Sequence, residues 1–233
     1  SVRGRAADAL GSAFDQVPNK PQAWQDLHRL TQDEDSFVRG RAADALGSAF
    51  GQVPDKLQAW QDLHRLTQDE DGSVRGRAAD ALGSAFDQVP DKPQAWQDLD
   101  RLNNDKESSV RSSSLYSSGK ASILKATESE NDSSFREYLV QAIDFFERSQ
   151  KESWYNPARF CLPLYRSFYY IVFSKIKDQS EVNRYLIEAK SAVKQSKSKE
   201  VLFEAVESLS QALAYFQKAK NATIQDRQIH LDA

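Results

Sequence analysis

The stretch from residue 37 to residue 72 reads FVRGRAADALGSAFGQVPDKLQAWQDLHRLTQDEDG, and almost the same text precedes and follows it. Residues 1–36 match this stretch at 31 of 36 positions, and they match residues 73–108 at 30 of 36. A degenerate fourth copy covers residues 109–126. Self-similarity at a fixed period of 36 residues indicates a repeat architecture.

Each 36-residue copy has the pattern of two helices. Apolar residues follow the i, i+3, i+4, i+7 spacing in each half, which places them on one side of a helix. In the first copy they are Val2, Ala6, Ala9, Leu10, Ala13, Phe14 and Val17, then Ala23, Trp24, Leu27 and Leu30. The second helix is predicted to be capped by Asn19, Asp55 and Asp91 in successive copies. Because no segment alternates with period two, we predict an all-α protein.

A helical hairpin of this size cannot cover its own apolar stripes. Neighbouring hairpins are therefore expected to stack and bury these stripes against one another, which predicts an α-solenoid. Trp24, Trp60 and Trp96 are expected to contribute much of the buried area.

The domain prediction divides the chain into a repeat array at 1–126 (copies 1–36, 37–72, 73–108 and 109–126), a C-terminal helical capping domain at 127–220, and a polar tail at 221–233 that continues into missing sequence. A capping-box helix is expected from Ser134, followed by an aromatic-rich segment at 154–173 and helices near 182–193 and 201–216. We interpret these elements as the closure of the array, because an open end would expose apolar surface. The alternative is an aromatic pocket centred on Trp154, Tyr155, Tyr165 and Tyr169.

Composition excludes several classes of protein. The 233 residues contain no Met, one Cys and no long apolar segment, which predicts an excerpt of a longer cytoplasmic protein with no membrane span. Residues 1–108 carry a net charge of −6, and the rest of the chain carries +3. Nucleic acid is therefore an unexpected partner, since phosphate binding normally uses a strong basic excess.

The pattern Asp-x-Asp-x-x-Val-Arg-x-x-Ala-x-x-Ala-Leu-Gly resembles HEAT repeats of the short kind that is also named after phycobilisome lyases. It is carried by Asp33, Asp35, Val38, Arg39, Ala42, Ala45, Leu46 and Gly47. The near-identical copies are most similar to uncharacterised archaeal HEAT-repeat proteins. The resemblance implies a fold and no particular activity, since such repeats occur in scaffolds, regulators and a few enzymes.

The resemblance also implies an Asp-Arg ladder that holds consecutive copies in register. Arg3 and its equivalents lie near the apolar stripe, and a charge there requires a partner. We expect the partner of each Arg to be the Asp in the turn that precedes it. The residues of this turn ladder are Arg39, Arg75, Arg111, Asp33, Asp69 and Asp105.

Catalytic and metal sites have little support in the sequence. His28 and His64 occupy equivalent positions, but the third copy has Asp100 there, and no metal-ligand spacing surrounds them. Cys161 is expected to be a buried, inert thiol. Asp26, Asp62 and Asp98 are interpreted as a solvated face. We therefore expect no enzyme activity, no cofactor and no metal.

The remaining candidate is a surface. Rows of polar residues are expected along the second helices, which usually line the concave side in HEAT arrays. The candidates are Gln25, Arg29, Gln61, Arg65, Gln97 and Arg101. Recent duplication could also have copied these residues without selection for any ligand.

We expect a non-catalytic interaction, scaffold or sensor module, monomeric within a longer chain, that binds a protein partner along this face. Two alternatives stay open. One is a HEAT-type enzyme that acts on nucleic acid or a modified protein, and the other is a regulatory segment of a nucleotide-driven switch.

Overall fold

The computed structural model describes residues 1–153, 156–173, 184–185 and 187–188, and within these ranges the protein is all-α, with no strand. It divides into two compact units, Ser1–Ala158 and Arg159–Ala233. The helices are α1 (Val2–Ala13), the 3-10 turn η1 (Phe14–Gln16), α2 (Lys20–Leu30), α3 (Ser36–Ala49), α4 (Lys56–Leu66), α5 (Gly72–Ala85), α6 (Lys92–Leu102), α7 (Ser108–Thr127), α8 (Asp132–Glu152) and α9 (Ala158–Phe173).

Side-chain caps determine where the helices begin. The side chains of Asn19, Asp55 and Asp91 accept hydrogen bonds from the backbone N–H groups three residues further on, as the sequence predicts. α8 begins earlier than predicted. Its cap is Asn131, which accepts from the N–H of Ser134, so Asp132 and Ser133 already belong to the first turn of the helix.

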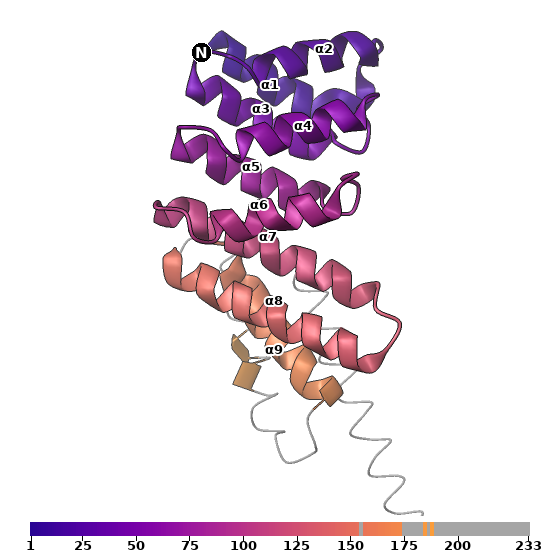
Figure 1. Ribbon diagram of the computed structural model, residues 1–233, viewed down its shortest axis with the longest axis vertical. Helices are drawn as coiled ribbons and strands as arrows, with labels where there is room; N and C mark the ends of the chain where they lie inside the picture. Colours follow the sequence, from indigo (N-terminus) through magenta and orange to yellow (C-terminus); the bar gives the residue numbers. More distant parts are fainter. Residues whose placement is uncertain (154–155, 174–183, 186, 189–233) are drawn as a thin grey trace, which may run out of the picture. The chain divides into compact units, whose positions relative to one another are not determined.

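The helices of the first unit form two layers (Figure 1). α1, α3, α5 and α7 lie side by side, each in contact with the next. α2, α4 and α6 form the second layer, and each packs against the first-layer helix of its own copy and of the next copy. The apolar stripes meet between the layers, where Leu27, Leu63 and Leu99 are each 0% exposed.

Glycine allows the first-layer helices to approach closely. A Cβ added at Gly47 would lie 2.6 Å from the Cα of Ala81, and one at Gly11 would lie 2.6 Å from the Cα of Ala45. No side chain fits at these distances, because the obstacle is the backbone of the next helix. The spacing of the stack therefore depends on this glycine position.

α8 completes the first unit by packing along α7. Ser149 Oγ donates to the carbonyl of Ser112 at 2.7 Å, and Asn156 Nδ2 donates to Ser112 Oγ at 2.7 Å. The first unit therefore includes α8 and ends at Ala158.

The second unit is described mainly through α9. Burial raises the pKa of Tyr165 to about 12, and the rings of Tyr169 and Tyr170 meet edge to face at 5.9 Å. Cys161 is half-buried, not buried as expected. Trp154 and Tyr155, the predicted helices near 182–193 and 201–216, and the predicted polar tail fall outside the described residues. No helix in the described part of the chain combines the length and apolarity needed to cross a membrane.

Candidate functional site

The arginines of the turn ladder join consecutive copies. Arg75 donates from Nε and Nη2 to the carboxylate of Asp105 at 2.7 and 2.9 Å, and from Nη1 to the carbonyls of Asp69 and Glu70 at 2.8 and 2.9 Å. Arg39 makes the equivalent bonds to Asp69 and to the carbonyls of the turn before it. The bond from Arg75 lowers the pKa of Asp105.

The direction of this pairing differs from our prediction. Each carboxylate belongs to the turn that follows its arginine, and the preceding turn contributes only backbone carbonyls. Asp33 accordingly pairs with Arg3, at 3.2 Å. Arg111 pairs with Glu152 of α8 at 2.7 Å, and Asp105 offers it only a carbonyl. The guanidinium thus spans two turns, because its Nη1 and its Nε edge point in opposite directions along the stack.

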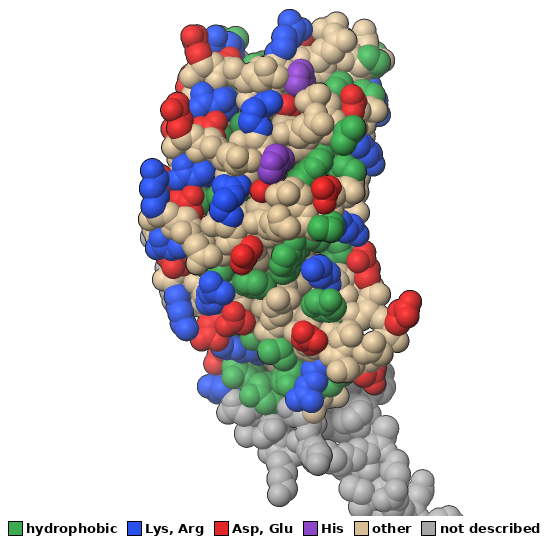
Figure 2. Space-filling view, in the orientation of Figure 1, with side chains coloured by type: hydrophobic (Ala, Val, Ile, Leu, Met, Phe, Trp, Pro, Cys, Tyr) green, Lys and Arg blue, Asp and Glu red, His purple; other side chains and the backbone are tan. Residues whose placement is uncertain are grey.

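A second row of polar contacts joins the second-layer helices. His28 Nδ1 lies 2.5 Å from Asp62 Oδ2, and His64 Nδ1 lies 2.6 Å from Asp98 Oδ2. We call these four residues the helix ladder. In the space-filling view the two histidines lie one above the other, with basic side chains beside them (Figure 2).

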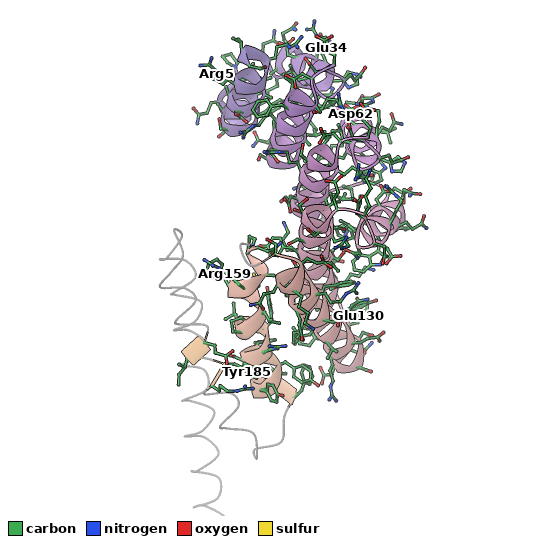
Figure 3. The ribbon with its side chains drawn as sticks, turned by 90° about the vertical axis from the view of Figure 1, so that its left-hand side faces the viewer. Arg5, Glu34, Asp62, Glu130, Arg159 and Tyr185 are labelled. Carbon is green, nitrogen blue, oxygen red and sulfur yellow. The ribbon has the colours of Figure 1, made fainter. Side chains whose placement is uncertain are left out.

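The helix ladder corrects our interpretation of the aspartates. Asp62 and Asp98 are 0% and 2% exposed, so only Asp26 is partly solvated as we expected. Figure 3 labels Asp62, which lies in the second layer of the stack. A buried carboxylate requires partners, and Asp62 obtains one from the previous copy and one, Arg65, from its own helix at 2.9 Å.

Two of the candidate binding arginines also hold the stack together. Arg65 Nη2 donates to Thr31 Oγ1 at 2.8 Å, and Arg101 Nη2 donates to Thr67 Oγ1 at 2.9 Å, in each case across the boundary between copies. Arg29 has no earlier copy to contact in the described chain, and its side chain is 69% exposed. The arginine row is therefore only partly available for a ligand.

The sequence of the third copy differs from that of the first mainly just before α7. Relative to the first copy it differs at six positions, and five of these lie between the last turn of α6 and the start of α7: Asp100, Asn103, Asn104, Lys106 and Glu107. No repeat-type second helix follows α6, so no buried aspartate faces Asp100 among the described residues. Asn103 instead bonds Ser118 of α7. The change at Asn103 therefore coincides with a new contact to α7.

The face that remains for a ligand is polar. Gln25, Gln61 and Gln97 are exposed at equivalent positions of α2, α4 and α6. Beside them is an open hollow of about 680 Å³ at the end of α2 and α4. It is lined by Thr31, Gln32, Arg39, His64, Arg65, Gln68 and Asp69.

Metal binding gains no support from this arrangement. Within the described ranges, no group of three or more His, Cys, Asp or Glu side chains could hold a metal ion. His28 and His64 each bond an aspartate of the next copy. Each also lies 3.0 Å from a glutamine in the turn that follows its own helix, Gln32 or Gln68.

Comparison with known proteins finds no matching family model and no similar curated protein. The HEAT-like assignment is therefore carried forward as a proposal that rests on the repeat pattern.

The helix ladder is the feature that our sequence reasoning missed. The signal was present, because each His precedes an Asp of the next copy by 34 residues, and the third copy loses its His where no such Asp follows. A comparison of which residues vary together between copies would have identified it.

Proposed function

We propose that residues 1–158 form an α-solenoid of 36-residue HEAT-like hairpins, and that α8 closes its C-terminal end. We further propose that this unit is a non-catalytic interaction or scaffold module that acts in the cytoplasm. Its partner is a protein that binds along the face of α2, α4 and α6.

The observation that carries the proposal is the combination of the glutamine row with the adjoining hollow. Each copy presents one exposed glutamine at the same position, and the hollow adds His64, Gln32 and Gln68. Such side chains can both donate and accept hydrogen bonds, so they can pair with the N–H and C=O groups of a protein segment. The repeat spacing would present them as an extended row, typical of solenoid binding surfaces.

The arginines are secondary in this proposal. Arg65 and Arg101 stabilise the stack through Thr31 and Thr67, so changing them would disturb folding and binding together. Gln25, Gln61 and Gln97 are better probes, because they are exposed.

The test is affinity capture from the native cell with the protein as bait. The triple variant Gln25→Lys, Gln61→Lys, Gln97→Lys should lose the captured partner while its helical circular dichroism is unchanged. The matched control is Ser12→Lys, Ser48→Lys, Ser84→Lys, which adds the same charge at exposed positions of the first layer. Capture that survives the glutamine changes, or that is lost equally in the control, would contradict the proposed face.

A further inference from the structure

The outer side of α1 and α2 is a stacking surface without a neighbour in the described chain. Val38 and Val74 are each 0% exposed, because the preceding copy covers them, whereas Val2 is 77% exposed. The same contrast between the first copy and the next two holds at further positions. Ala6, Ala9, Leu10, Ala13 and Leu30 are exposed or half-buried, and all of their equivalents in the second and third copies are buried.

The polar contacts of this surface are also incomplete. Asp62 bonds a histidine of the preceding copy, but among the described residues its equivalent Asp26 bonds only Gln22 and Arg29 of its own helix. Arg77 pairs with Asp44 across the copy boundary. Its equivalent Arg5 has no ion pair among the described residues, and it projects outward from α1 in Figure 3.

The exposed apolar residues and the incomplete polar contacts together define the chemistry of a partner that would cover this surface. At each of the two boundaries between the three full copies the preceding hairpin contributes four residues. An Asp pairs with the equivalent of Arg5, a His with the equivalent of Asp26 and a Thr with the equivalent of Arg29, and a Gly makes room for the equivalent of Ala9. In the second copy these are Asp44, His64, Thr67 and Gly47.

We propose that this surface binds a helical hairpin of the same 36-residue type. The inference rests on the contacts observed at the copy boundaries and not on the glutamine face. A second copy of this chain is a poor occupant, because it would have to present the side of a hairpin that faces the following copy. In the first three copies this side is in contact with the next copy. On α7 it is in contact with α8, where Phe146 faces Gly119 and Glu152 pairs with Arg111.

The test extends the protein by one copy of residues 37–72 placed directly before Ser1. The junction then reads Gly-Ser-Val, as at Gly72, Ser73 and Val74. Asp26→Ala is measured by urea denaturation in the original and in the extended protein. We expect the unfolding equilibrium constant to change less than twofold in the original protein. In the extended protein it should rise at least tenfold, as for Asp62→Ala.

The control is an extended protein whose added copy carries His64→Ala and Gly47→Arg, which removes the histidine partner and blocks the close approach. In this control Asp26→Ala should again change the constant less than twofold. The proposal is overturned if Asp26→Ala stays neutral in the extended protein, or if the added copy does not increase the helical signal. It is also overturned if the original chain dimerises in sedimentation experiments and Val2→Lys abolishes the dimer.

Discussion

His28 of α2 and the buried Asp62 of α4 are 34 residues apart in the chain and 2.5 Å apart in space. The same relationship recurs between His64 and Asp98, and it ends at the third copy, where Asp100 replaces the histidine. The histidine therefore belongs to the contact between copies.

Exchanging His28 of the first copy with Asp100 of the third should change the unfolding free energy very unequally. His28→Asp places a second carboxylate against buried Asp62, and we expect a loss of about 3 to 5 kcal/mol of unfolding free energy, typical of an uncompensated buried charge. The control Asp100→His should stay within about 0.5 kcal/mol, because Asp100 is exposed. Urea denaturation of both variants checks the pair. Equal losses would show that the position matters for a reason other than the aspartate.

The ion pairs of the turn ladder should contribute most to the unfolding free energy where they are buried. Arg75→Ala removes a guanidinium that is 8% exposed and leaves Asp105 unpaired, so we expect a loss of about 3 to 5 kcal/mol. The equivalent change Arg3→Ala removes a side chain that is 53% exposed, and it should cost less than about 1 kcal/mol. Thermal or urea unfolding compares the two. If Arg3→Ala were as damaging as Arg75→Ala, burial would not be the cause.

Two glycines of the first layer should respond in opposite directions to alanine. Gly47→Ala forces a Cβ to within 2.6 Å of the next helix, and overpacking of this kind costs about 1 to 3 kcal/mol. At Gly76 the nearest atoms lie 3.9 Å away, so Gly76→Ala should stabilise the protein by up to about 1 kcal/mol through helix propensity. The measurement is the unfolding free energy of each variant. Destabilisation by Gly76→Ala would contradict the geometric explanation.

Acid should weaken the cap of α5. Hydrogen bonds from the Ser73 and Ser36 hydroxyls lower the pKa of Asp71 from 3.8 to about 2. Because the folded-state pKa lies below the unfolded one, the Asp71 carboxylate contributes stability above about pH 3.8, and this contribution is lost as the pH falls towards 2. Ser73→Ala removes one donor and should raise this pKa, which an NMR titration of the carboxyl carbon measures. An unchanged titration curve would exclude Ser73 as the cause.

The repeat period and the helix caps made much of the first unit predictable. Asn19, Asp55 and Asp91 cap the second helices as expected, because capping depends on residues only three positions apart. The start of α8 was less predictable, because we expected the helix from Ser134, whereas Asn131 caps it three residues earlier.

The partners of charged residues were harder to predict than the helices. Arg39 is close to Asp33 in the sequence, but its guanidinium bonds Asp69 instead. Which aspartate it reaches depends on the distance between neighbouring copies, which the sequence does not state. The burial of Asp62 was likewise hidden, since a single helix pattern places it at the edge of the apolar stripe and only the preceding copy, through His28, covers it. Of the predicted binding residues, the glutamines are exposed, while Arg65 and Arg101 contact the neighbouring copy.

The most direct measurement of contact between copies is a double-mutant cycle on His28 and Asp62. The unfolding free energies of His28→Ala, Asp62→Ala and the double variant give the coupling between two residues that only stacking brings together. We predict a coupling of about 1 to 3 kcal/mol, within the range for residues in contact. Effects that add to within about 0.3 kcal/mol would show that the two residues do not interact, and would contradict the stacked arrangement.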